Sequence, residues 1–152
     1  FLTLPACTGT IAFQGQGYAV SRLRKAPFLK SRRIIYWGDV DCQGFEILAA
    51  LRREFPQTES LMMDNDTWEQ FAGYRVSGVA SRNAAEQFLP HLRGGEGALF
   101  SAVSESGLRL EQERIPQDYA TRRILEILGG CRQPDVLEIP DSSSLRASNT
   151  LP

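Results

Sequence analysis

Asp39 and Asp41, two aspartates separated by one residue, are the side chains of this 152-residue sequence whose type and spacing best suit metal chemistry. They follow residues 33–37, an apolar run rich in β-branched and aromatic side chains that predicts a buried strand. Residues two apart on an extended chain point to the same side, so the two carboxylates should lie close together and repel. A divalent cation relieves that repulsion, and hard oxygen ligands favour Mg²⁺ or Mn²⁺. Spacing alone also allows a surface turn or a helix cap.

The segment that follows the pair should position it. Apolar residues at helical spacing predict a helix from Gly44 to about Phe55, with Pro56 as its stop. Gly44 permits close approach of the backbone, and the N-terminus of the helix would favour a phosphate near the aspartates. In parallel α/β sheets, ligands gather at the carboxyl ends of the strands, which is where Asp39 and Asp41 would lie.

The remaining patterns indicate the fold class. Short apolar runs predict strands at residues 10–13 and 60–63, and helical spacing predicts a helix over residues 18–29. A helix should also open at Asp66, whose segment to Glu69 fits a capping box. Strand, helix, strand, helix and strand in this order predict an α/β fold with a parallel sheet. Beyond residue 75 we expect helices over 84–92, 97–104 and 116–128, with an extended piece over 108–115.

The charges are unevenly distributed. Residues 1–38 contain six basic side chains and no acidic one, whereas the rest of the chain has 11 basic and 18 acidic ones. The six are Arg22, Arg24, Lys25, Lys30, Arg32 and Arg33. A basic segment that runs into an acidic cluster suits a site for phosphodiesters, since the cations attract phosphate and the carboxylates hold metal. The alternative is a solvated basic face.

Several other classes of site are excluded. The run from Gly15 to Val20 has Val20 where a dinucleotide fingerprint needs its third glycine, and no P-loop signature exists. Three widely spaced cysteines and one histidine argue against a zinc site and favour a reducing cytoplasm.

No apolar run is long enough to span a membrane, and no signal peptide is visible. The absence of an initiator methionine indicates a fragment.

Four motifs in order resemble a known family. They are Gly15 to Val20, Tyr36 to Leu48, Ser60 to Thr67 and Leu108 to Ile115. Tyr-Trp-Gly-Asp-Val-Asp with the following Gly-Phe resembles the acidic motif of Toprim domains, including that of the topoisomerase VI A subunit. The whole set is similar to the C-terminal domain of JetD, the nuclease subunit of Wadjet plasmid-defence systems, over about residues 1–130.

The resemblance implies a Toprim-like parallel sheet flanked by helices, with residues 1–75 as a core that lacks its first strand. Residues 76–139 would be a helical extension and residues 140–152 a disordered tail. In Toprim proteins a first-strand Glu joins the aspartate pair in binding Mg²⁺, and here it would precede Phe1. The implied activity is metal-dependent cleavage of plasmid DNA. The implied partners are DNA and the condensin-like SMC, kleisin and accessory subunits, with a homodimer in the parent protein.

The resemblance also singles out three further acids. Asp64 follows the strand predicted at 60–63 and would either approach the metal or cap the next helix. Glu111 and Glu113 are again two residues apart and would either contact the metal or form salt bridges with Arg109 or Arg114. For DNA contact we expect Gly15, Gln16 and Gly17 near phosphate, together with five basic residues: Arg22, Arg24, Lys25, Arg32 and Arg33.

The sequence therefore predicts that Asp39 and Asp41 are metal ligands of a DNA phosphodiesterase. Water activated by the metal is preferred to a tyrosine nucleophile, because no separate domain carrying such a tyrosine is present. The main alternative is a non-catalytic DNA-binding or assembly module with the same fold. A second is a Toprim-like enzyme acting on other phosphoesters.

Overall fold

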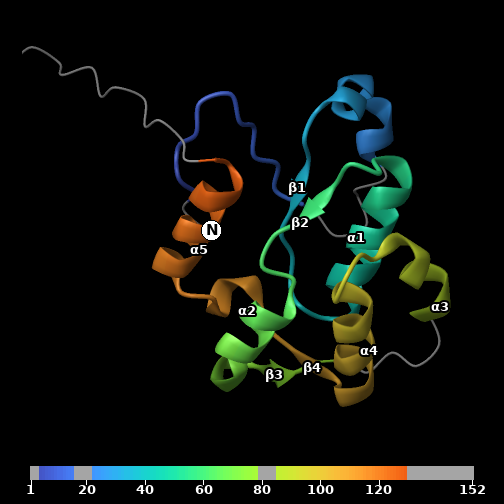
Figure 1. Cartoon of the computed structure of the whole chain (residues 1–152), viewed down its shortest axis with the longest axis vertical. Coiled ribbons are helices and arrows are strands. Elements are labelled where there is room, and N and C mark those ends of the chain that lie inside the picture. Colours follow the sequence, from blue (N-terminus) through green and yellow to red (C-terminus); the bar gives the residue numbers. More distant parts are fainter. Residues whose placement is uncertain (1–3, 16–21, 79–84, 130–152) are drawn as a thin grey trace, which may run out of the picture.

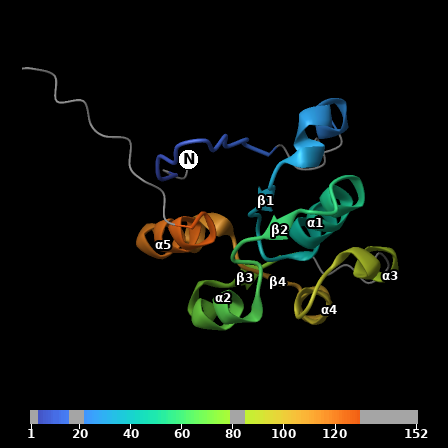
Figure 2. The ribbon, with the colours of Figure 1, turned by 45° about the horizontal axis from the view of Figure 1, so that its top comes forward.

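The computed structural model of the chain describes residues 4–15, 22–78 and 85–129. Two short strands, β1 (Ile35–Tyr36) and β2 (Glu59–Ser60), pair in parallel with Ile35 opposite Glu59. The helix α1 (Cys42–Glu54) connects them. Both Figure 1 and Figure 2 show α1 on one side of this strand pair and α5 (Gln117–Ile127) on the other. The mixed α/β class predicted from the sequence is confirmed.

The strand–helix–strand unit forms where the pattern predicted it. α1 begins two residues before Gly44 because Asp41 is its N-cap. It ends at Glu54, one residue before Phe55 and two before Pro56. Its apolar stripe is buried, with Phe45, Leu48 and Ala49 fully enclosed. The strand predicted at 60–63 is shorter and begins one residue earlier, at Glu59.

The second half of the described chain is mainly helical. After β2 come α2 (Asn65–Gln70), the 3-10 turn η3 (Ala72–Tyr74) and β3 (Val76–Ser77). Then follow α3 (Ala85–Phe88), the 3-10 turn η4 (Leu89–His91), α4 (Glu96–Ser106) and β4 (Leu108–Arg109). The 3-10 turn η5 (Gln112–Arg114) leads into α5. β3 and β4 pair antiparallel, and Figure 1 shows them between α2 and α4.

Most of the helices predicted beyond residue 75 are confirmed. α4 contains the segment predicted at 97–104, and α5 is one residue shorter at each end than the segment predicted at 116–128. Gly107 ends α4 in a left-handed conformation at φ 63°. The helix predicted over 84–92 divides into α3 and η4, because Pro90 has no N–H for a regular helical hydrogen bond. The helix predicted to open at Asp66 begins at Asn65, since Asp64 is its cap.

Two predictions for the N-terminal segment are wrong. Residues 10–13 form no strand, and Ile11 and Phe13 are 71% and 60% exposed, so most of the apolar run faces solvent in the described chain. The predicted helix over 18–29 is instead a 3-10 turn over 22–25, followed by the 3-10 turn η2 (Pro27–Ser31). Pro27 opens η2 rather than ending a longer helix. Residues 16–21 and the tail predicted at 140–152 lie outside the described residues.

The main core fills the space between α1, α2, α4 and α5. Its largest fully buried side chains include Phe45, Phe100, Met62 and Met63. A smaller cluster of Leu29, Leu51 and Phe55 joins η2 to the far end of α1. No helix in the described ranges is long and apolar enough to cross a membrane.

One ion pair is buried inside this structure. Arg52 of α1 meets Glu96 of α4 with two guanidinium nitrogens, and their side chains are only 4% and 9% exposed. The Arg52 guanidinium also donates to the carbonyl oxygens of Thr58 and His91 at 3.0 and 3.1 Å. Burial works to raise the pKa of Glu96, but hydrogen bonds from Arg52, Ser60 and the Arg93 N–H outweigh it, so the pKa lies below its ordinary value of 4.5.

We predict that Glu96→Gln lowers the free energy of unfolding at neutral pH by about 3–5 kcal/mol, because it leaves the buried Arg52 charge without its partner. The wild-type contribution is fully present above the ordinary pKa of 4.5 and is lost as the pH falls through the lower folded-state pKa. The variant should therefore also lose part of the pH dependence of stability in that acid range. Urea unfolding of both proteins across this range measures both effects.

Glu59→Gln is the matched control. Its partner Arg33 is 50% exposed at the side chain, and exposed pairs contribute about 0–1 kcal/mol. A loss in Glu96→Gln as small as that in Glu59→Gln would show that the buried pair is not a major contributor.

Candidate metal centre

Asp39 and Asp41 lie in the connection between β1 and α1, on either side of a buried residue. Val40 forms an isolated antiparallel bridge with Leu110, in which each N–H donates to the other carbonyl oxygen at 2.9 and 3.2 Å. Both side chains are fully buried. Since side chains alternate along an extended segment, the inward direction of Val40 leaves the two aspartates partly exposed on the other side.

Asp41 is tied to the helix that it precedes. Its backbone is extended, at φ −150°, and its Oδ1 accepts a hydrogen bond from the Gly44 N–H at 2.7 Å. This is an N-cap, which satisfies one of the free amides in the first turn of α1. The cap was one of the alternatives left open by the spacing, and it leaves the second carboxylate oxygen available.

Asp39 is tied to a distant segment instead. Its Oδ1 accepts the Gln112 N–H at 2.9 Å. Burial raises the pKa of Asp39 above its ordinary value; the Gln112 hydrogen bond opposes this, and the negative charges of Asp41, Glu113 and Glu111 add to it. The Asp39 carboxylate thus lies in a negative potential, and a bound cation would relieve that potential.

The neighbouring Tyr36 experiences the same potential. Burial, followed by the charges of Asp39 and Asp41, raises the pKa of its hydroxyl well above the ordinary value of 10.0. Tyr36 therefore stays neutral at physiological pH. It packs against both core clusters.

Gly44 allows the turn between the strand and the helix to close. A Cβ at this position would lie 2.0 Å from the carbonyl oxygen of Asp39, which is backbone and cannot rotate away. The expected close approach is thus the contact between the Gly44 Cα and the Asp39 carbonyl. It folds the Asp39–Asp41 turn onto the start of α1.

Glu111 and Glu113 flank the residue that holds Asp39. Glu111 pairs with Arg109 through one oxygen and with Arg114 through the other, the latter at 2.8 Å. The hydrogen bond from Arg114 lowers the pKa of Glu111, burial opposes this, and the charges of Arg109 and Arg114 add to it. The salt-bridge alternative is therefore observed for Glu111. Glu113 is exposed and forms no ion pair within the described residues.

Asp64 caps a helix, as one of its two alternatives anticipated. Its Oδ1 accepts the Thr67 N–H at 2.8 Å at the start of α2, and its Oδ2 lies 3.7 Å from a guanidinium nitrogen of Arg123 on α5. Any part in metal binding stays a prediction for this residue.

The aspartate pair fits a small hard cation in its chemistry. Mg²⁺ commonly uses one or two protein carboxylates and keeps several waters, and Asp39 and Asp41 each have one oxygen that accepts no hydrogen bond in the described chain. Within residues 4–15, 22–78 and 85–129, no group of three or more His, Cys, Asp or Glu residues is arranged to hold a metal ion. The pair would thus supply two ligands.

The basic segment lies at the opposite end of β1 from the aspartates. Residues 22–33 precede the strand and Asp39 and Asp41 follow it, as Figure 1 shows by the blue turns above β1. Arg33 binds both oxygens of Glu59 and donates to the Ile127 carbonyl at 2.6 Å, so it joins β2 to the end of α5. Arg24 pairs with Glu54 at 3.4 Å.

The other predicted DNA contacts divide into two groups. Arg22, Lys25 and Arg32 are exposed and form no ion pair within the described residues. Gly15 is exposed, and Gln16 and Gly17 lie outside the described residues. Their roles stay predictions.

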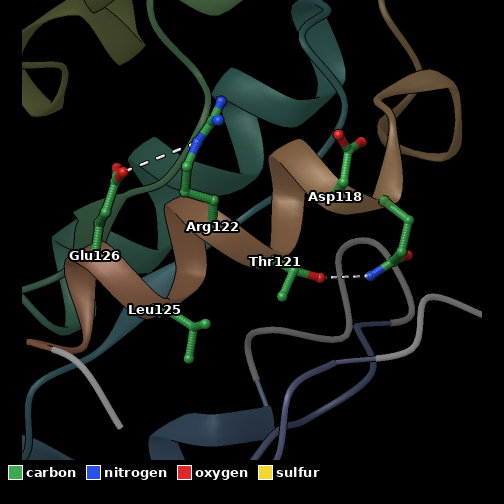
Figure 3. Close-up of a pocket in the computed structure, with 6 residues that line it drawn as sticks. Asp118, Thr121, Arg122, Leu125 and Glu126 are labelled. Carbon is green, nitrogen blue, oxygen red and sulfur yellow. Dashed lines mark hydrogen bonds and ion pairs between the residues drawn. The ribbon is translucent and has the colours of Figure 1, made fainter.

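A shallow hollow of about 740 Å³ lies elsewhere, on the exposed face of α5. Figure 3 shows its lining, in which Arg122 reaches Glu126 and the Gln117 amide reaches Thr121. None of the predicted site residues lines it. The chemistry of the aspartate pair is thus separate from this hollow.

Two parts of the centre were missed by sequence reasoning: the Gln112 amide and the Val40–Leu110 bridge. The alternation of Leu108 and Leu110 indicated an extended piece, which was a usable signal. The pairing of Leu110 with Val40 could not be predicted from the sequence. The two residues are 70 positions apart, and a bridge of one residue pair produces no periodic pattern in the sequence.

The comparison with protein families identifies the family of this chain. The model of the family described as "Wadjet protein JetD, C-terminal" matches residues 1–124. No curated protein matches the chain.

We predict that Gly44→Ala lowers the free energy of unfolding by about 1–3 kcal/mol or more, as overpacking typically does. The added Cβ collides with the Asp39 carbonyl and should displace the aspartate turn from α1. Urea unfolding measures the loss.

Gly73→Ala is the control, since a Cβ there meets nothing within 4 Å. It should leave stability unchanged or raise it by about 0.4–1 kcal/mol. Equal stabilities of the two variants would contradict the close contact.

Proposed function

Because the chain belongs to the family of C-terminal domains of the Wadjet protein JetD, we propose that it is a Mg²⁺- or Mn²⁺-dependent DNA nuclease domain. Membership in this family implies a role in Wadjet anti-plasmid defence and in its multi-subunit complex. The observation that carries the proposal is the partly buried Asp39–Asp41 pair, held by Gln112 and Gly44 with the pKa of Asp39 raised.

The aspartate pair and the start of α1 would have different roles in the proposed reaction. Asp39 and Asp41 would hold the cation through their second carboxylate oxygens. The N-terminus of α1, directly after the pair, favours a phosphate group at the same place. When bound, the metal lowers the pKa of a water molecule and stabilises charge on the phosphate. Hydrolysis would join a water oxygen to phosphorus as one P–O bond to deoxyribose breaks, and the proton lost by the water would balance the proton taken up by the leaving oxygen.

A Toprim-like arrangement is part of the proposal. The parallel pairing of β1 with β2, the crossover through α1 and the aspartates at the carboxyl end of β1 all support it. The two-stranded sheet is smaller than the Toprim sheet inferred from the motifs. We also propose DNA, the condensin-like SMC, kleisin and accessory subunits, and a second copy of the full-length protein as partners.

A second candidate function is a non-catalytic DNA-binding or assembly module. It is favoured by the lack, within the described residues, of a third acidic ligand arranged with the pair. It is also favoured by the position of the exposed cations at the far end of β1. Metal binding separates the two candidates, because the module needs no Mn²⁺ and the nuclease does.

We predict that Asp39→Asn and Asp41→Asn each reduce plasmid cleavage by the full-length protein about 100-fold or more, since each removes a charge from the metal site. Both variants should fold: asparagine is as good an N-cap as aspartate, and at position 39 it still accepts the Gln112 N–H. Cleavage of supercoiled plasmid with Mg²⁺ or Mn²⁺ measures the effect, and Mn²⁺ titration measures binding.

Asp66→Asn is the matched control, because Asp66 is exposed in the first turn of α2. It should cut at the wild-type rate. Undiminished cutting by both site variants would refute the nuclease proposal, and a wild type that neither binds Mn²⁺ nor cuts would favour the module.

We further predict that replacing Arg22, Lys25, Lys30 and Arg32 with glutamine weakens DNA binding without changing Mn²⁺ affinity. Each phosphate that is no longer neutralised should reduce the slope of log affinity against log salt by about 0.9. DNA titrations at several salt concentrations measure this slope. Arg53→Gln with Arg122→Gln removes exposed cations outside the segment and should leave the slope unchanged. An unchanged slope in the fourfold variant would mean that the segment is only a solvated basic face.

A further inference from the structure

The turn between β4 and α5 touches the aspartate loop at two places, both through the backbone. Leu110 forms the two-hydrogen-bond bridge with Val40, and the Gln112 N–H reaches Asp39 Oδ1. The orientation of the Asp39 carboxylate therefore depends on the path of the chain through residues 110–112. A displaced turn would move the donor and release the carboxylate.

Three side chains, one at the end of β4 and two in the turn, hold that path. The two oxygens of Glu111 are occupied, one by the Arg109 guanidinium and the other by Arg114 Nε at 2.8 Å. Arg109 precedes Gln112 and Arg114 follows it, so these ion pairs brace the segment from both sides. The Arg114 N–H also donates to the Glu111 carbonyl at 2.9 Å, within η5. All three side chains are partly exposed, at 39%, 26% and 45% for Arg109, Glu111 and Arg114.

Partial exposure limits what these pairs add to stability, but it does not limit their effect on geometry. Exposed ion pairs contribute little free energy because water screens them and because ordering the long side chains costs entropy. A carboxylate that forms ion pairs with two guanidinium groups, as that of Glu111 does, nevertheless has few possible orientations. The partners that orient a metal ligand act in this way, and their loss lowers metal affinity.

On this basis we propose that Glu111 is a positioning residue whose ion pairs with Arg109 and Arg114 hold the Gln112 amide against Asp39. This inference rests on the proposed function, since it assigns Glu111 to the support of the metal ligand. Glu111 is thereby distinguished from a ligand, because both of its oxygens are already occupied by arginine.

The direction in which one substitution changes the Mn²⁺ affinity tests the proposal. Arg114→Gln removes a positive charge near the pair, so charge alone would tighten Mn²⁺ binding. A ligand role for Glu111 would also tighten it, since Glu111 would be released to the metal. The positioning role requires the opposite, a weakening on the order of tenfold. Mn²⁺ affinity is measured on the full-length protein by electron paramagnetic resonance of the free ion.

Three variants complete the experiment. Arg114→Lys keeps the charge but lacks the planar guanidinium fork, so it should also weaken Mn²⁺ binding. Glu111→Gln should weaken Mn²⁺ binding by more than Glu113→Gln, because both remove one negative charge but only Glu111 forms the ion pairs. Tighter binding by Arg114→Gln, or equal losses in the two glutamine variants, would overturn the inference.

The outcome for the proposed function stays separate. If the wild type binds Mn²⁺ and Arg114→Gln does not weaken that binding, the inference about Glu111 fails, but the proposed metal site is still supported. If the wild type binds no Mn²⁺, the metal site fails, and hydrogen exchange of the Gln112 amide then decides the inference. That amide should exchange faster in Arg114→Gln and Glu111→Gln than in Glu113→Gln, and equal exchange rates in all three would overturn the inference.

Discussion

The buried ion pair between Arg52 and Glu96 sets the relative positions of the elements around it. Arg52 belongs to α1 and Glu96 to α4, while Ser60 of β2 and the Thr58 and His91 carbonyls complete their hydrogen bonds. A charged pair withdrawn from water is tolerated only when nearly all of its donors and acceptors are used. Because the partners are so numerous, α1, β2 and α4 have few ways to shift without breaking one of them.

The pair lies near the C-terminal end of α1, and the aspartates lie at its other end. A helix of 13 residues is about 20 Å long, so the groups that fix the helix are well separated from the groups proposed to act on a phosphodiester. The N-terminal end is held by weaker and more local means: the Asp41 cap, the Gly44 contact and the Val40–Leu110 bridge. The C-terminal end of α1 thus carries the buried ion pair that supports the fold, and its N-terminal end carries the charged, partly exposed carboxylates.

The sequence predicted the parts of this arrangement that depend on local patterns. The strand predicted at residues 33–37, observed only over Ile35–Tyr36, and the helix after Asp41 could be predicted because apolar spacing and Pro56 define them. Residues 10–13 were misassigned, because an apolar run predicts a strand only if a partner covers it, and Ile11 and Phe13 face solvent in the described chain. The pairing of Val40 with Leu110 and the Gln112 bond to Asp39 are contacts over about 70 residues. Such contacts depend on how α2 and α4 pack between them, which no local pattern encodes.

The two aspartates differ in what holds them, and this difference affects how sequence variation at each should be interpreted. Asp41 caps its own helix, so folding alone would restrict position 41 to small polar residues even in a descendant that had lost all activity. Asp39 caps nothing and accepts its bond from a distant backbone amide. An inactive descendant would therefore be free to change position 39 first. Among relatives of this domain, the residue at 39 should distinguish working copies from decayed ones better than the residue at 41.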